Sequence, residues 1–153
     1  MVQPYSDGDL LKALASWPEN HTPSSDQEKT FHAVLLLSVG QADAAAKEIE
    51  GLKSPAANAI RELIAVVKRQ KISPLAQPTT ASEWLARSYT FQSESKLSEA
   101  LKAAREATAK SPNFGFAWVR VAELEFSFGH TAAALDALDK GLSASPATRK
   151  GWR

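Results

Sequence analysis

The feature that most constrains the fold of this 153-residue chain is the return of the same residue types at intervals of 34 positions. Three kinds of residue keep this interval, a coincidence that is difficult to obtain by chance. They are Trp84 and Trp118, Ala100 and Ala134, and Pro78, Pro112 and Pro146. A period of roughly 20 to 50 residues is typical of repeat proteins, whose units bury their apolar faces against one another. The sequence therefore predicts an array of similar units.

Each interval is expected to hold two helices. In the first interval, Thr80 and Glu83 have the spacing of a capping box, so a helix should begin near Ala81. A polar break, SESK, separates this helix from a second one, which should end at Ser111 because Pro112 disfavours helical dihedrals in the residue before it. The residues expected on the buried face of the second helix are Leu97, Ala100, Leu101, Ala104 and Thr108.

The next interval repeats this plan. A helical segment, FGFAWVRVAELEFSF, precedes a turn at Gly129 and His130, and TAAALDALDKGLSASP follows the turn. Glycine can reverse the chain at a helix end without a steric penalty from a Cβ atom, so the two helices should be antiparallel. We expect the side chain of His130 to lie in solvent.

These residues resemble the tetratricopeptide repeat (TPR) family. The residues that carry the resemblance are Trp84, Ser88, Phe91, Ala100 and Pro112 in one copy, and Trp118, Val121, Ala122, Gly129, Ala134, Leu138 and Pro146 in the next. Three positions depart from the family pattern: Arg87 replaces leucine, Ala104 an aromatic residue and Glu125 a tyrosine. The resemblance implies an all-α fold in which antiparallel helix-pair repeats stack as a short right-handed α-solenoid, the TPR-like superhelix.

The whole chain, residues 1–153, is predicted to form a single helical-repeat domain. The predicted divisions are an N-terminal capping helix (1–24), a degenerate TPR (25–53), an extra helix with a Pro-rich loop (54–80), two clearer TPRs (81–114 and 115–148) and the start of a truncated further repeat (149–153). Ser25 and Glu28 form the expected capping box of the degenerate repeat, and Ser54 followed by Pro55 is a typical helix start. The extra helix should interrupt strict stacking.

The last division depends on Trp152, which follows Trp118 by 34 residues. In this interpretation the chain is a fragment or a truncated array. An apolar face should then stay open after residues 131–144, and we expect the last residues or a neighbouring molecule to cover it. Self-association through this face is therefore one of the predictions.

Composition and motifs argue against catalysis and against several classes of partner. The chain has no cysteine, which excludes disulfides, thiolate catalysis and cysteine-ligated zinc. Its three histidines are scattered, and no Gly-rich phosphate loop or GxSxG elbow occurs. The net charge of +1 does not favour nucleic acid, and the longest apolar runs are too short to span a bilayer. We expect a soluble cytoplasmic or periplasmic chain that is not an enzyme, needs no cofactor or metal, binds no nucleic acid and does not insert into a membrane.

An aromatic cluster near the second repeat has two interpretations. Its members are Phe114, Phe116, Trp118, Phe126 and Phe128. In the first interpretation, the rings pack between the helices of each pair as core. In the second, which the TPR resemblance implies, the inner helix of each repeat lines a concave groove that holds a peptide or a partner protein. The groove residues that it assigns are Ser82, Leu85, Tyr89, Gln92 and Ser93 from one unit and Phe116, Val119, Glu123, Phe126 and Ser127 from the next.

Two functions are consistent with these observations. The leading hypothesis is a protein–protein interaction scaffold that binds its partner through the aromatic-lined groove. The alternative is a non-catalytic structural or oligomerisation segment of a larger bacterial sensor or enzyme. Residues 111–138 also resemble repeat regions attached to iron-dicitrate-sensor-like (FecR) domains of bacterial envelope proteins.

Overall fold

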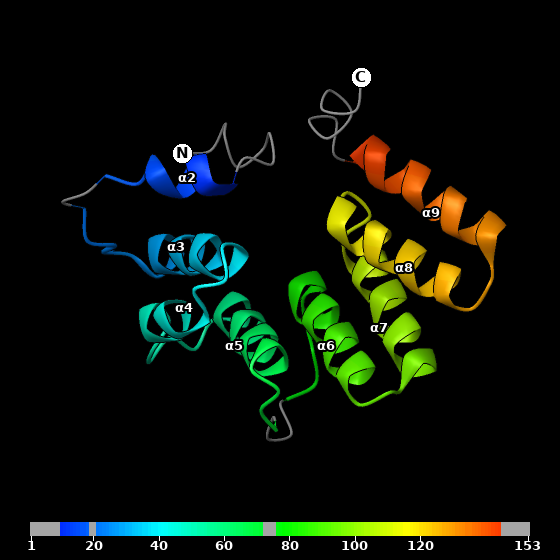
Figure 1. Ribbon diagram of the computed structural model, residues 1–153, viewed down its shortest axis with the longest axis horizontal. Coiled ribbons are helices and arrows are strands. Elements are labelled where there is room, and N and C mark those ends of the chain that lie inside the picture. The colour runs from blue at the N-terminus through cyan, green and yellow to red at the C-terminus, as the bar shows by residue number, and fades with distance from the viewer. Residues whose placement is uncertain (1–9, 19–20, 72–75, 145–153) are drawn as a thin grey trace.

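The computed structural model describes residues 10–18, 21–71 and 76–144, which form eight α-helices and no β-sheet. The helices are α2 (Leu10–Ala15), α3 (Asp26–Ser38), α4 (Ala42–Glu48), α5 (Pro55–Val67), α6 (Ala81–Ser93), α7 (Leu97–Lys110), α8 (Gly115–Ser127) and α9 (Thr131–Ala144). Most of them pack as sequential antiparallel pairs. Figure 1 shows the helices following one another around an arc, with α2 and α9 at its two ends. The all-α prediction is confirmed, whereas the predicted further repeat at 149–153 lies outside the described residues.

The two helix pairs of the second half have the same dimensions. α6 begins at Ala81 and α8 at Gly115, 34 residues later, and each contains 13 residues. α7 begins at Leu97 and α9 at Thr131, again 34 residues later, and each contains 14 residues. The interval between tryptophans and prolines in the sequence is therefore also the interval between equivalent helices.

The turns inside these two pairs share one backbone conformation. After α6, the Lys96 N–H donates to the Phe91 carbonyl at 2.8 Å, and the equivalent bond after α8 measures 2.9 Å. The residue before the donor lies in the left-handed region, with φ of +61° at Ser95 and +80° at Gly129. Such a turn satisfies carbonyl groups at the helix end that have no partner within the helix.

The predicted helix starts are confirmed. At α6 the Glu83 N–H donates to Thr80 Oγ1 at 3.4 Å, and the Glu83 carboxylate accepts from the Thr80 N–H at 3.0 Å. Ser25 and Glu28 form the same reciprocal pair at the start of α3. Ser54 caps α5 with its side chain. Local side-chain chemistry therefore sets the first residue of each of these three helices.

Small side chains allow close packing in the second half. Ala100 and Ala104 of α7 are fully buried, and they share one apolar cluster with Val121 and Leu124 of α8. The prediction that Leu97 lies on this buried face was wrong, because Leu97 is 37% exposed. Leu97 is the first residue of α7 and lies beside the polar turn, at the edge of the packed face.

At the other end of the arc, α2 packs against α3. Trp17, just beyond α2, stacks on His32 of α3 with 4.4 Å between ring centroids. The Trp17 indole N–H donates to the His21 carbonyl at 3.1 Å. His32 Nδ1 also lies 3.2 Å from a carboxylate oxygen of Glu48 in α4. Aromatic and polar contacts thus link the first three described helices.

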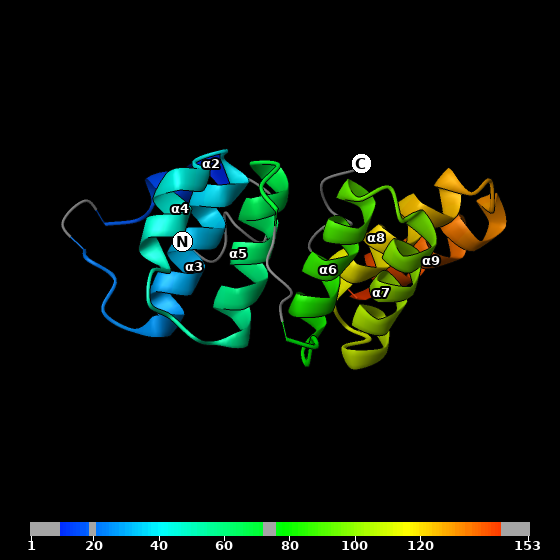
Figure 2. The same ribbon diagram turned by 90° about the horizontal axis from the view of Figure 1, so that it is seen from below.

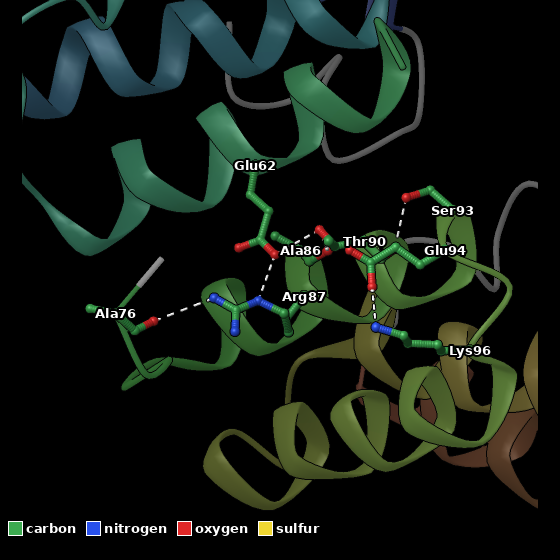
Figure 3. A network of polar contacts seen from close by, with 8 residues as sticks. All are labelled: Glu62, Ala76, Ala86, Arg87, Thr90, Ser93, Glu94 and Lys96. Atoms are coloured by element: carbon green, nitrogen blue, oxygen red, sulfur yellow. Dashed lines mark hydrogen bonds and ion pairs between the residues drawn. The ribbon is translucent and has the colours of Figure 1, made fainter. Parts of the chain in front are cut away.

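The extra helix α5 lies between the two sets of paired helices, and Figure 2 shows it beside α6. Buried polar groups join the two helices. The Glu62 carboxylate of α5 accepts from Arg87 Nε at 2.7 Å and from Thr90 Oγ1 at 2.6 Å (Figure 3). The extra helix was predicted to interrupt strict stacking; in the structure α5 packs directly on α6 and also contacts α3 and α4.

Candidate protein-binding surface

One side of α8 presents large apolar side chains to solvent. Phe116, Val119 and Phe126 follow one another at separations of three and seven residues, which places them on one side of a helix. Phe116 is 65% exposed, Phe126 is 68% exposed and Val119 is exposed to a smaller extent. The opposite side of α8, which includes Val121 and Leu124, is buried in the core. We name Phe116, Val119, Glu123 and Phe126 the α8 stripe.

The α6 part of the predicted site is more polar and less exposed. Ser82 and Gln92 are exposed, whereas Leu85 and Tyr89 are half-buried. α6 and α8 are in direct contact, so the residues predicted from the two repeats belong to neighbouring helices. The two serines that complete the prediction, Ser93 and Ser127, are also exposed.

A buried arginine connects the α6 and α8 parts of the surface. The Arg120 guanidinium donates to Ser88 Oγ at 3.0 Å and to Gln92 Oε1 at 2.6 Å, both on α6. It also donates to Glu123 Oε2 at 3.1 Å, one turn further along α8. Its central carbon lies 3.9 Å from the centroid of the Tyr89 ring. Three of the predicted residues, Tyr89, Gln92 and Glu123, are therefore held in one network.

This network determines the charge that the surface presents. Burial raises the pKa of Tyr89 above its ordinary value of 10.0, Glu123 raises it further and Arg120 opposes both effects. The Tyr89 phenol is therefore protonated at neutral pH, and its ring offers an uncharged contact. Because Glu123 is paired with Arg120, the surface is apolar and aromatic with one compensated acid.

The aromatic cluster divides between the core and the surface. Trp118 is half-buried against the apolar cluster formed by α7, α8 and α9. Phe128 stacks on the imidazole ring of His130 with 6.0 Å between ring centroids. Phe114 meets Phe116 edge-on at 6.2 Å. Phe116 and Phe126 nevertheless keep about two-thirds of their area exposed, so they are not core residues. The core interpretation therefore holds for Trp118 and not for Phe116 and Phe126, whose contact with a partner stays a prediction.

The structural role of Arg120 was not predicted from the sequence. A charged residue inside the apolar run FAWVRVA is a signal that it joins a buried polar network. Its partners could not be identified, because Ser88 and Gln92 precede it by 32 and 28 residues and meet it only through the packing of two helices.

Glu125 is a second buried charge whose role was missed. Its carboxylate lies 2.8 Å from His130 Nδ1 and also pairs with Arg105. The hydrogen bond with His130 is the main cause that lowers the pKa of Glu125, burial opposes it, and Arg105 lowers the pKa further. His130 was expected in solvent, and its side chain is 60% exposed, but it is fixed to Glu125. This pairing holds the turn that leads from α8 into α9.

The acidic side chains of α8 do not converge on one point. Among the described residues, no group of three or more His, Asp or Glu side chains could hold a metal ion. Glu123 is exposed and Glu125 is buried, so these two acids do not share a site. A shallow depression of ≈ 500 Å³ lies beside Trp118 and Lys140, and none of the predicted groove residues lines it. We name the α8 stripe together with Ser82, Leu85, Tyr89 and Gln92 of α6 the α6–α8 surface, and its exposed phenylalanines suit it to contact with apolar groups.

Within the described part of the chain, no helix is long and apolar enough to cross a membrane. Comparisons of the chain with protein-family models, with curated proteins and with solved structures found no match. The function is therefore inferred from the chemistry of the surface.

Proposed function

We propose that this chain is a non-catalytic scaffold of the TPR type that binds a protein or peptide through the α6–α8 surface. The observation that carries the proposal is the exposure of Phe116 and Phe126 on a helix whose opposite side is packed in the core. Large apolar side chains on a pre-formed surface bury much area on binding and lose little conformational entropy.

The TPR assignment is supported by the equal lengths of the two helix pairs and by their 34-residue offset. Two departures from the family pattern have a local explanation. Arg87 pairs with the buried Glu62 of the extra helix, and Glu125 pairs with His130 and Arg105. The right-handed superhelix is part of the proposal.

The spacing of Phe116 and Phe126 sets the distance expected between two apolar side chains of the partner. They are ten residues apart on α8, which corresponds to about 15 Å along the helix axis. A peptide with two apolar anchors at that separation fits this surface, either as roughly five extended residues or as about three turns of helix. Glu123 lies between the anchors, so a polar or basic residue should separate them in the partner.

The test begins with a peptide library displayed on phage and selected on the intact chain. Selected peptides are synthesised, and fluorescence anisotropy measures their Kd for the wild type and for the Phe116→Ala, Phe126→Ala double variant. A hot-spot aromatic residue costs about 2 kcal/mol when it is truncated, which is about 30-fold in Kd, so the loss of both rings should raise the Kd by at least about 30-fold. Circular dichroism verifies that the variant keeps its helices.

Phe128→Ala is the matched control, because Phe128 is an exposed phenylalanine of the same region outside the α8 stripe. It should bind the selected peptides as the wild type does. Equal affinity for wild type and double variant would contradict the proposal, and so would a selection that enriches no peptide over an unrelated helical protein.

A further inference from the structure

The contact between α6 and α8 shows what a stripe of this kind can hold. The α6 residues that correspond to the α8 stripe, 34 positions earlier, are Ser82, Leu85, Tyr89 and Gln92. The last two receive the Arg120 guanidinium of α8, whose central carbon lies 3.9 Å from the centre of the Tyr89 ring and which donates to Gln92 Oε1 at 2.6 Å. On α6, an aromatic ring and an oxygen acceptor three residues apart thus hold a cation that a neighbouring helix delivers.

The same two kinds of group recur on α8 in the reverse order. Adding 34 to the numbers of Tyr89 and Gln92 gives Glu123 and Phe126, again one oxygen acceptor and one aromatic ring three residues apart. The Glu123 side chain is 53% exposed, and Phe126 is 68% exposed. Among the described residues, Glu123 meets a cation only through its Oε2 atom, which accepts from Arg120 of the same helix at 3.1 Å. Its second carboxylate oxygen and the Phe126 ring can therefore receive a cation from outside.

The spacing of the α8 stripe matches a partner helix better than an extended peptide. Its residues follow one another at separations of three, four and three, which is the seam of two packed helices. Along such a seam, the side chains of a partner helix recur on average about every 5.2 Å, the same interval as on α8. On one face of an extended peptide they recur about every 6.8 Å, so they lose step with the stripe. A helix can therefore contact all four positions of the stripe.

We infer that the partner of the α8 stripe is an amphipathic helix that places an arginine against Glu123 and Phe126. This inference rests on the proposed peptide binding and specifies the chemistry of the partner. Arginine suits the position better than lysine, because a planar guanidinium can stack on the Phe126 ring while its N–H groups donate to the Glu123 carboxylate. A polar pair inside an otherwise apolar seam also fixes the register of the two helices.

The peptides selected on the intact chain give the first test. We expect them to carry an arginine between two apolar residues at helical spacing. When a synthetic peptide of this kind binds, the circular dichroism of the complex should show more helix than the sum of its components. Proline at a solvent-facing position in the middle of the peptide should raise the Kd by at least about tenfold, because proline breaks a helix.

A double-mutant cycle tests the arginine itself. Replacing the peptide arginine by citrulline, which has a similar shape and no charge, should raise the Kd for the wild-type chain by about tenfold. Glu123→Gln should bind the arginine peptide with the same reduced affinity and lose nothing further with the citrulline peptide. Glu106→Gln is the matched control, because Glu106 is an exposed glutamate on α7, outside the α6–α8 surface. It should bind both peptides as the wild type does, and circular dichroism verifies that both variants fold.

The outcomes separate this inference from the proposed function. Selected peptides that need Phe116 and Phe126 but bind in an extended form would overturn the inference and leave the binding surface as proposed. Equal affinity of the arginine peptide for wild type and Glu123→Gln would have the same meaning, and so would selected peptides that carry an acidic residue in place of the arginine. A selection that enriches no peptide, or only peptides that bind the Phe116→Ala, Phe126→Ala variant equally well, would overturn both proposals.

Discussion

At the residue scale, one turn holds a serine in a conformation that suits glycine. Ser95 has φ of +61° between α6 and α7, and the equivalent residue after α8 is Gly129, with φ of +80°. A residue with a Cβ atom is destabilised by about 1–2 kcal/mol in the left-handed region. Glycine avoids this steric cost but loses more conformational entropy on folding, which offsets part of the gain. Ser95→Gly should therefore raise the free energy of unfolding by about 0.5–1 kcal/mol.

Urea unfolding followed by circular dichroism measures this change. The reciprocal variant Gly129→Ser is the control, and it should lose a similar amount. A Cβ at Gly129 would meet no atom within 4 Å, so backbone conformation alone is responsible for the loss. If Ser95→Gly destabilises the chain, the account of this turn is wrong.

A second effect at this scale makes the free energy of unfolding depend on pH through Glu125. The hydrogen bond with His130 is the largest cause that lowers the pKa of Glu125 below its ordinary value of 4.5, despite its burial. A carboxyl with a lowered folded-state pKa contributes stability above its unfolded-state pKa, and the contribution is lost as the pH falls through the folded-state pKa. The urea midpoint should therefore fall as the pH drops below about 4.5, and Glu125→Gln should make that fall shallower.

The comparison needs a control because other acids contribute to the same slope. Backbone and side-chain hydrogen bonds from Ser24 and Ser25 lower the pKa of Glu28 to about 2. In Glu125→Gln the urea midpoint should consequently still fall with pH, but less steeply than in the wild type. Glu50→Gln, which changes an exposed acid in a turn, should keep the wild-type slope. Identical slopes for wild type and Glu125→Gln would show that Glu125 has no such effect.

At the scale of the element, the starts of α3, α5 and α6 could be predicted because their causes are local. Thr80, Ser25 and Ser54 each cap a helix within three residues of themselves. The contacts that Arg120 and Glu62 make with α6 could not be predicted, because these partners lie 25 to 32 residues away and meet only when the helices pack. The predicted surface residues lie on α6 and α8 as expected, but the network that holds them was found only in three dimensions.

The Glu62 network gives a prediction about the junction of α5 and α6. Removing one partner of a buried ion pair leaves the other charge uncompensated, so Glu62→Ala should cost about 3 kcal/mol of folding free energy. In the TPR family, which this sequence resembles, leucine is usual at the position of Arg87. The double variant Glu62→Leu, Arg87→Leu should therefore recover most of the loss and end within about 1 kcal/mol of wild type.

Denaturant unfolding of the two variants compares these values. A double variant that is as unstable as Glu62→Ala would contradict this account. It would mean that the directed hydrogen bonds from Arg87 and Thr90 to Glu62 stabilise the fold in a way that packed leucines cannot replace.

At the scale of the whole molecule, exposed apolar side chains gather at one end of the arc. Ten large apolar side chains of the described residues are exposed, and seven belong to α8, the turn after it and α9. Within this end, the α8 stripe and the exposed leucines of α9, which are Leu135, Leu138 and Leu142, lie on different helices. Substitutions on one helix should therefore leave the exposed side chains of the other in place.

If the α8 stripe receives a partner, amide chemical shifts of the isotope-labelled chain should change there when a selected peptide is added. The largest changes should fall on Val119, Glu123 and Phe126 and on the side-chain amide of Gln92. Changes confined to Leu135–Leu142 of α9, or to helices α2–α5, would contradict this prediction.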